Sequence, residues 1–358
     1  MPDMIVPPSA LRPSTAPLAA RLRDHLSAHP QAHLRDAAET LGVPELAVLQ
    51  VHESANSVQL RSDDWPTLLT DFATLGEVRT MTRNVSAVIE RTGTYLGVQS
   101  FGSMGQAVGP EIDVRAFFRE WHSAWAVSTA TSHGLRRSIQ LFDAAGDSIH
   151  KVFVTDSGVA AFGRVIARFH AVAAPTVTFA PRPLNVERPD ASVDIAEFHA
   201  RWDAMKDTHE FHGLLRALHL TRTQALRLAG TSRARQVTAQ ALERTLDMAA
   251  GAGERLMIFV GNRGIVQIHI GTIHRVMRAS GWLNILDPRF NLHVRDTDIA
   301  SAWVVTKQSS DGPIQSLELF DASGATILQI FGKRAEGAGS TPPGFKAMLQ
   351  TLIAECAA

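Results

Sequence analysis

Alternating apolar and polar positions, interrupted by short glycine-containing turns, predict β-hairpins at three places in the chain. In each hairpin, two runs rich in β-branched and aromatic residues flank the turn. The paired runs are residues 138–142 with 148–154, residues 257–260 with 265–270, and residues 316–320 with 326–331. Hairpins of this kind join neighbouring antiparallel strands, so the pattern predicts antiparallel sheets in both halves of the chain.

Other stretches place apolar residues every three or four positions, which is the spacing of one helical face. This spacing predicts helices over residues 18–28, 34–41, 159–171, 241–250 and 344–354. Two more helices should begin after good capping residues. One follows Asp194, and the other follows Thr221, where residues 221–224 fit a capping box.

The helix after Asp194 has the most informative stripe. Four apolar residues and then two histidines follow at spacings of three or four: Ile195, Phe198, Trp202, Met205, His209 and His212. The stripe predicts one continuous helix with the histidines on a buried face. A buried imidazole needs a partner, because leaving it unsatisfied costs about 1–3 kcal/mol.

Residues 84–153 match residues 262–331 at a constant offset of 178, with no insertion or deletion. Twenty of these seventy positions are identical, whereas ordinary composition would give roughly four or five. We therefore predict an α+β tandem repeat in which each half is an antiparallel sheet flanked by helices. The N-terminal repeat is placed at residues 1–173, a proline-rich linker at 174–192 and the C-terminal repeat at 193–358.

Composition narrows the class of protein. The 358 residues include 35 Lys or Arg and 35 Asp or Glu, a balance that argues against a broad nucleic-acid surface. The single cysteine, Cys356, excludes a disulfide framework, a cysteine zinc site and a CxxCH haem attachment. No apolar run has the length of a membrane span or the form of a signal peptide. We therefore expect a cytoplasmic protein that is not embedded in a membrane.

The two histidines of the stripe allow more than one interpretation. They could be core residues that bond to backbone carbonyls, or one could be the axial ligand of a haem iron. Zinc is a weaker interpretation, because His209 and His212 lack the third and fourth ligands of a zinc site. The chain has no motif typical of a serine nucleophile, a dinucleotide fold or a phosphate loop.

Differences between the two repeats mark further candidates. Arg115 stands where the C-terminal repeat has His293, and Lys307 stands where the N-terminal repeat has Thr129. Either difference could be ordinary surface drift, although apolar sequence neighbours are unusual for a solvated arginine such as Arg115. Cations able to bind two carboxylates recur in the second half of the chain: Arg222, Lys307, Lys333 and Arg334.

Several segments, in order, resemble the HemS/HmuS/ChuS-type haemin-degrading and haem-trafficking proteins of Gram-negative bacteria. The resemblance covers about residues 30–355 and is carried by residues 202–209, 220–222, 259–264, 281–285, 310–312 and 317–320. It implies a cleft in the C-terminal repeat that binds haem b (iron protoporphyrin IX), with the N-terminal repeat contributing the distal side. It also implies His209 as the axial iron ligand. His212, where many relatives carry an aromatic residue, could be a second or substitute ligand.

The resemblance also implies roles for residues around the haem. Arg115 would lie on the distal side, and the propionates would meet Arg222, Lys307 and Arg334. A protonated guanidinium has no lone pair, so Arg115 should act as a hydrogen-bond donor rather than as a ligand. Phe331 stands where the family commonly has a tyrosine, so one propionate hydrogen bond would be missing. Candidates for the apolar walls are Phe211, Leu214, Phe290, Phe320 and Phe331.

Two functions are compatible with such a site. The chain could carry haem from an inner-membrane importer to a haem oxygenase, which would make it part of haem uptake and iron acquisition. Alternatively, it could itself cleave haem oxidatively, with electrons from a partner reductase, and Arg115 would then be catalytic. The chain has no flavin or nicotinamide motif, which favours the carrier. A protein-interaction module with core histidines is a third, haem-free interpretation.

Overall fold

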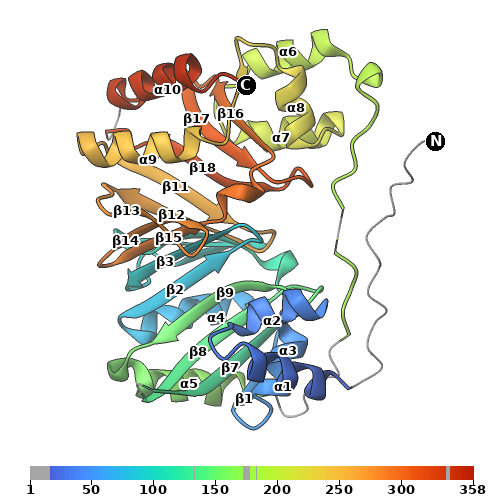
Figure 1. Ribbon diagram of the computed structural model, residues 1–358, viewed down its shortest axis with the longest axis vertical. Coiled ribbons are helices and arrows are strands. Elements are labelled where there is room, and N and C mark those ends of the chain that lie inside the picture. The colour runs from blue at the N-terminus through green and yellow to red at the C-terminus, as the bar shows by residue number, and fades with distance from the viewer. Residues whose placement is uncertain (1–16, 133, 172–177, 183, 336–338) are drawn as a thin grey trace, which may run out of the picture.

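Two antiparallel sheets of nine strands each, with ten α-helices packed around them, form the described part of the chain (Figure 1). The computed structural model describes residues 17–132, 134–171, 178–182, 184–335 and 339–358. The first sheet contains, in spatial order, β1 (Ser57–Leu60), β7 (Ser123–Thr131), β8 (Gly134–Phe142), β9 (Ser148–Val154), β2 (Val78–Arg83), β3 (Ala87–Gly93), β15 (Phe290–Val294), β14 (Trp282–Asp287) and β13 (Val276–Ala279). The second contains β10 (Ala234–Val237), β16 (Ser301–Lys307), β17 (Ile314–Phe320), β18 (Thr326–Gly332), β11 (Leu256–Gly261), β12 (Ile265–Gly271), β6 (Asp113–Phe117), β5 (Met104–Val108) and β4 (Gln99–Phe101). The helices are α1 (Leu18–Ala28), α2 (Leu34–Leu41), α3 (Glu45–His52), α4 (Trp65–Asp71), α5 (Val159–Phe169), α6 (Ile195–Asp203), α7 (Glu210–Leu218), α8 (Arg222–Leu228), α9 (Ala241–Ala252) and α10 (Pro343–Glu355).

The predicted α+β class, hairpins and helix starts are confirmed. The three hairpins are β8–β9, β11–β12 and β17–β18, and α1 and α2 have the predicted bounds. The Asp194 side chain caps α6 by accepting a hydrogen bond from the backbone N–H of Glu197 at 2.9 Å. The Thr221 hydroxyl caps α8 by accepting from the N–H of Gln224 at 3.1 Å.

The two repeats exchange strands, which the sequence pattern did not predict. Each sheet takes six strands from one repeat and three from the other. Strand β15 of the C-terminal repeat pairs with β3, so that Leu292 lies opposite Ile89. Strand β6 of the N-terminal repeat pairs with β12, so that Val114 lies opposite Gln267. The linker at residues 174–192 therefore separates the repeats in sequence, while both sheets contain strands from either side of it.

Two equivalent asparagines hold the exchanged halves together. The Asn84 amide donates to the carbonyl of Ile327 at 2.8 Å, and the Asn262 amide donates to the carbonyl of Ile149 at 2.8 Å. Asn262 and Ile327 each lie 178 positions after their counterparts. The two contacts are thus the same contact made twice, and the repeats are related by an approximate two-fold axis.

The helices cover the faces of the second sheet unequally. Helices α9 and α10 pack against one face, where Leu246, Ile258 and Phe345 share a buried core. On the other face, α6, α7 and α8 cover only the end formed by β10, β16 and β17, where Trp202 and Phe320 are buried together. The middle of that face is left without a helix (Figure 1).

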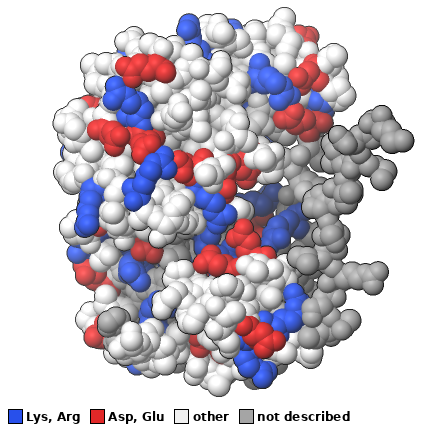
Figure 2. Space-filling view, viewed as in Figure 1, with Lys and Arg blue, Asp and Glu red and all other residues white. Residues whose placement is uncertain are grey.

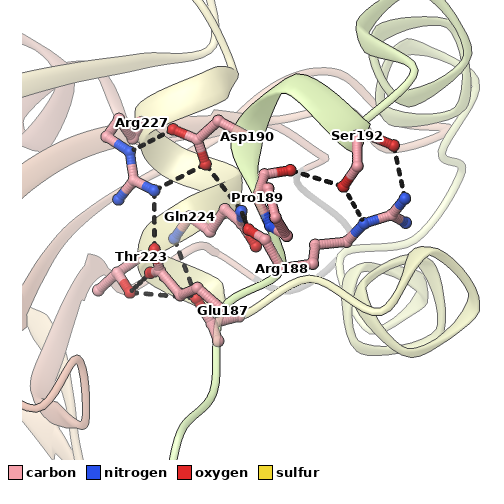
Figure 3. Close-up of polar contacts among 9 residues, drawn as sticks. Glu187, Arg188, Pro189, Asp190, Ser192, Thr223, Gln224 and Arg227 are labelled. Carbon is pink, nitrogen blue, oxygen red and sulfur yellow. Dashed lines mark hydrogen bonds and ion pairs between the residues drawn. The ribbon is translucent and has the colours of Figure 1, made fainter.

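The C-terminal part of the linker is fixed to α8 (Figure 3). The carboxylate of Glu187 accepts hydrogen bonds from the Thr221 and Thr223 hydroxyls and forms an ion pair with Arg227 at 2.7 Å. Asp190 accepts from the same arginine at 2.9 Å. These contacts hold the start of the helix whose first residue is Arg222.

A buried hydrogen-bond chain between the sheets predicts sensitivity to acid. The Tyr95 hydroxyl lies 2.6 Å from His150 Nε2, and His150 Nδ1 lies 2.7 Å from the Thr82 hydroxyl, which donates to Gln267 at 2.8 Å. The Thr82 hydroxyl donates its one proton to Gln267, so it can only accept a hydrogen bond from His150. His150 Nδ1 is therefore the donor to Thr82. The ring is therefore neutral and fully bonded, and burial lowers the pKa of His150 to about 3.

We expect the free energy of unfolding to fall as the pH falls from about 6.5 towards 3. Below about pH 6.5 the unfolded chain protonates this histidine while the folded chain does not, and the slope is about 1.4 kcal/mol per pH unit. Urea unfolding at pH 7, 6, 5 and 4 measures it. The His150→Leu variant carries the leucine that the C-terminal repeat has at position 328. This variant should be less stable at pH 7. Its free energy of unfolding should also depend less steeply on pH, by about 1.4 kcal/mol per pH unit. An unchanged slope would contradict the assignment.

Candidate functional site

The part of the second sheet that α6–α8 leave uncovered has an apolar centre. In antiparallel strands, residues directly opposite each other point to the same side. The register therefore places on one face a set of half-buried apolar side chains, here called the open face: Met257, Phe259, Val266, Ile270 and Phe331. Figure 2 shows a hollow between the parts of the molecule that carry α6–α8 and α1–α3, with charged side chains along it.

Arg115 lies at one side of the open face. It is on β6, directly opposite Val266, and its side chain is 34% exposed. It forms an ion pair with Asp113 and donates to the carbonyl of Val114 at 3.0 Å. Burial raises the pKa of Asp113, although the positive charge of Arg115 opposes this shift. Its apolar neighbours, Val114 and Ala116, point into the core on the opposite face, so the arginine itself is not in an apolar environment.

A buried group of charges lies on the same face, four strands away from Arg115, a separation of about 19 Å. Glu318 accepts from Arg222 Nε at 2.7 Å and from Lys307 Nζ at 2.5 Å. Both cations also lie over the ring of Phe211, at 5.2 and 4.9 Å from its centroid. We call Arg222, Lys307 and Glu318 the cation cluster. It holds two positive charges and one negative charge, so it retains a net positive charge.

Burial and charge shift the pKa values in the cation cluster in opposite ways. Burial alone would raise the pKa of Glu318, but the charges of Arg222 and Lys307 lower it below its usual range. Burial lowers the pKa of Lys307 to about 8, against the opposing charge of Glu318. The carboxylate therefore stays ionised at neutral pH, and the group keeps its attraction for a further anion.

The predicted continuous helix through His209 and His212 is wrong. Helix α6 ends at Asp203, and α7 begins only at Glu210. Between them the side chains of Asp207 and Glu210 accept hydrogen bonds from the backbone N–H groups of His209 and Lys206. Those N–H groups would otherwise continue the helical ladder.

The break changes the environment of His209. Its side chain is 91% exposed instead of lying on a buried face. Its Nδ1 lies 2.6 Å from Asp207 Oδ1. A carboxylate can only accept, so Nδ1 carries a proton, and the neutral ring keeps its lone pair on Nε2. The expectation of a buried histidine that needs a core partner is therefore also wrong. The ring is ready to bind a ligand through Nε2.

His212 lies one turn further along α7 and is also exposed. Partial desolvation, followed by the positive charges of Arg222 and Lys307, lowers its pKa to about 4. The ring is therefore neutral at pH 7 and can offer a lone pair beside the cation cluster. Neither histidine is one of the core residues bonded to backbone carbonyls that the haem-free interpretation required.

Arg334 lies near these histidines. It donates to the carbonyl of Gly339 at 3.2 Å and has no ion pair within 4 Å among the residues that the structure describes. The backbone N–H and ring of His209 lower the pKa of Asp207, and the charge of Arg334 contributes to the same shift. His209, His212, the cation cluster and Arg334 therefore lie around one end of the open face, and Arg115 lies at the other side.

The comparisons with known proteins place the chain in a family. The family model described as the haemin-degrading HemS/ChuX domain matches residues 42–169 and 219–352. The chain belongs to this family. The hemin transport protein HmuS of Yersinia pestis is 37% identical over 311 residues, which cover 86% of this chain and 90% of the relative. HemS of Yersinia enterocolitica, also a hemin transport protein, is 38% identical over 312 residues, with the same coverage.

Solved structures of HemS-family proteins have the same fold. Holo-PhuS, a heme-binding protein from Pseudomonas aeruginosa, has a TM-score of 0.88 and 37% identity, covering 94% of this chain and 98% of its own. ChuS, described as an Escherichia coli heme oxygenase, has a TM-score of 0.83 and 34% identity, covering 94% of this chain and 99% of its own.

Four of the five residues predicted as apolar walls are core residues. Phe211, Leu214 and Phe320 are buried beneath α6–α8, and Phe290 is buried in the first sheet, where it stacks on a histidine. Only Phe331 reaches the open face, edge-on to Phe259 at 5.2 Å. Phe259 was missed, although it shares a hairpin with Val266, and alternation along the strand could have placed both on one face.

The equivalent face of the N-terminal repeat keeps apolar residues at three of the five open-face positions, Met81, Val88 and Phe153, but is more polar around them. At the positions of Met257 and Ile268 it has Arg79 and Glu90, and at the positions of Lys307 and Glu318 it has Thr129 and Gln140. It does have an exposed histidine, His33, which is the N-cap of α2 just as His209 is the N-cap of α7. The pair Lys307 and Glu318 is therefore a feature of the C-terminal repeat, whereas the apolar floor is partly shared by both repeats.

Two general features complete the description of the site. No group of three or more His, Cys, Asp or Glu side chains arranged to hold a metal ion occurs in the described part of the chain. Within the same residues, no helix has the length and apolarity needed to cross a membrane.

Proposed function

We propose that the chain binds one molecule of haem b on the open face and delivers it for degradation. The observation that carries this proposal is the position of His209. It has a free Nε2 and lies at the end of an apolar surface that also holds a net positive cation cluster. The haem-binding and hemin-transport relatives support the same conclusion.

Each part of the site meets one requirement of a haem molecule. The ring needs apolar surface, which Phe259, Phe331 and their neighbours offer. The two propionates need cations, which Arg222, Lys307 and Arg334 would supply. The iron needs an axial base, which His209 Nε2 would supply, with His212 as a substitute within one turn. Phe331 cannot donate the hydrogen bond that a tyrosine would provide, so the propionates depend on these cations.

Asp207 should strengthen the axial bond by holding Nδ1 of His209. We expect Asp207→Ala to weaken haem binding by about 10–100-fold, because such outer partners of metal ligands have effects of this size. Haem titration followed by absorbance measures it. Asp207→Asn still offers an oxygen to Nδ1 and should recover part of the affinity. Equal affinities for the alanine variant and the unmodified chain would show that Asp207 has no such role.

Arg115 should influence the distal side without holding the haem. We expect Arg115→Ala to bind haem within about tenfold of the unmodified affinity, or about 1.4 kcal/mol. Its absorption spectrum should change, because a charged donor beside the bound ring is lost. Arg263→Ala, which removes an exposed arginine paired with Glu120, is the matched control. A spectrum identical to that of the unmodified chain would remove Arg115 from the site.

We infer that carriage is the main activity, within the cytoplasm, from an inner-membrane importer to a haem oxygenase. Two exposed histidines about one turn apart offer successive ligands, which suits transfer of haem from one to the other. The alternative is oxidative cleavage of haem by the chain itself with electrons from a partner reductase, and the resemblance to ChuS favours it. Arg115 would then stabilise negative charge that develops on the distal side.

A single-turnover experiment separates the two activities. The haem-loaded protein is mixed with a reductase in the presence of catalase, and the absorbance of intact haem is followed. Haem that remains intact until an oxygenase is added supports the carrier. Loss of haem to a ring-opened product before that addition supports the enzyme. Failure to bind haemin at a one-to-one ratio would contradict both the carrier and the enzyme interpretation.

A further inference from the structure

The first two helices and the turn between them form a shallow, open hollow of about 580 Å³, which has no part in the proposed haem site. Side chains from the end of α1, the following turn and the start of α2 line it: His25, Ala28, His29, Pro30, Gln31, Ala32, Asp36 and Thr40. The family match begins only at residue 42, so this hollow lies outside the segments that define the family.

Two imidazoles converge at the hollow. His25 and His29 are four residues apart, at the end of α1, and their ring centroids lie 4.8 Å apart at an angle of 43°. Residues four apart are neighbours on a helical surface, and two histidines with this spacing can bind one metal ion together. His25 is half-buried and His29 is exposed, so the pair is partly fixed and still accessible to solvent.

These rings have no other role in the fold. Neither imidazole has a hydrogen bond or an ion pair with any residue that the structure describes. Asp36, on the other wall of the hollow, likewise has no ion pair within 4 Å among those residues. Three polar side chains without partners among the described residues therefore line one hollow, and two of them are imidazoles that can offer a ring nitrogen to a metal ion.

The two repeats differ at these positions. Helices α1 and α6 begin 177 residues apart, and at this offset His25 and His29 correspond to Trp202 and Lys206. Trp202 is fully buried and serves the core beneath α7. The histidine pair is thus particular to the N-terminal repeat and is not required by the shared scaffold.

We propose that this hollow binds a divalent first-row transition-metal ion, with His25 and His29 as its two direct ligands. Imidazole nitrogen suits zinc, nickel and copper, and the order of affinities for such sites puts copper(II) first. Asp36 would add negative charge from the opposite wall through a bound water, and further waters would complete the coordination. With two protein ligands, the site would bind and release its ion readily, unlike a closed structural site.

Copper(II) binding by the full chain tests the proposal. The chain should carry no affinity tag, and His209→Ala/His212→Ala should be the background, so that the proposed haem site cannot take the ion. Calorimetry should find one copper site per chain, and electron paramagnetic resonance should show two coordinated nitrogens. Adding His25→Ala/His29→Ala to this background should weaken binding by at least about tenfold.

Two control variants make the assignment specific. His52→Ala removes another exposed histidine of the same repeat, on α3, and His33→Ala removes the histidine nearest in sequence that does not line the hollow. Both should leave copper binding unchanged. Copper binding that survives loss of His25 and His29, or that depends equally on His33, would overturn the proposal. The absence of any copper site with a dissociation constant below about 1 mM, or about −4 kcal/mol, would do the same.

Discussion

Replacing both His209 and His212 with alanine should lower haem affinity by at least about a hundredfold, or about 2.7 kcal/mol. The variant should also lose the spectrum of an imidazole-bound haem. The reason is that these two imidazoles are the candidate axial bases at this end of the open face, and the apolar floor and the cations cannot supply one. Haem titration and the absorption spectrum of the ferric form measure the effect.

The single variants separate the roles of the two histidines. His209→Ala should change the spectrum but keep part of the affinity, because His212 is one turn away and its lowered pKa leaves it neutral at pH 7. His219→Asn is the matched control, since it removes an exposed histidine just beyond α7 and asparagine tolerates the left-handed backbone, φ 53°, at that position. A double variant with an unchanged spectrum would show that the iron ligand lies elsewhere.

Replacing Glu318 with glutamine should destabilise the protein by about 3–5 kcal/mol, because it leaves the buried Lys307 without its carboxylate. Lys307 is 3% exposed and Glu318 is fully buried, so water cannot replace the lost contact. The change also removes the partner of Arg222. Urea unfolding at pH 7 measures the loss, and the variant should gain stability towards pH 9. The reason is that a buried lysine with a lowered pKa loses its proton in the folded chain at a lower pH than in the unfolded chain, so the free energy of unfolding rises with pH.

The N-terminal repeat provides the control for this variant. It has Thr129 and Gln140 where the C-terminal repeat has Lys307 and Glu318. Glu318→Gln with Lys307→Thr should therefore recover most of the stability lost in the single variant, and a double-mutant cycle should show strong coupling. The paired variant should nevertheless bind haem more weakly than the unmodified chain, because one cation has been removed. If the stability losses of the two single variants simply add in the double variant, the two side chains do not depend on each other.

Local features of the fold could be predicted from the sequence. Hairpins and helix starts depend on residues close together in the chain, such as the Asp194 and Thr221 caps, and those predictions are confirmed. The exchange of β4–β6 and β13–β15 was not predictable in this way. The exchanged strands pair across long sequence separations, as Val114 does with Gln267 and Ile89 with Leu292. Such pairing leaves no local periodicity, because a strand keeps the same alternation of apolar and polar residues whichever sheet it joins.

The candidate site was predicted less well than the fold. Arg115 and Lys307 were identified from differences between the repeats, and His209 and His212 from the helical stripe, but the environments of these residues depend on tertiary contacts. Asp207 and Glu210 interrupt a helix that the apolar stripe alone would continue, and this interruption exposes His209. Glu318 was missed, although it differs between the repeats together with Lys307. Thr129 and Gln140 are replaced together by Lys307 and Glu318 on neighbouring strands, and this paired difference could have identified Glu318.

The strand exchange described above suggests how one site could change while its twin did not. A symmetric pair of identical chains that traded three strands each would build two equal clefts, each made from both partners. In such a pair every substitution appears in both clefts at once. Once the two partners are joined in a single polypeptide, each copy can accept changes on its own. Arg115 and His293 would then be free to differ, and a buried cation cluster could be present in one cleft and absent from the other.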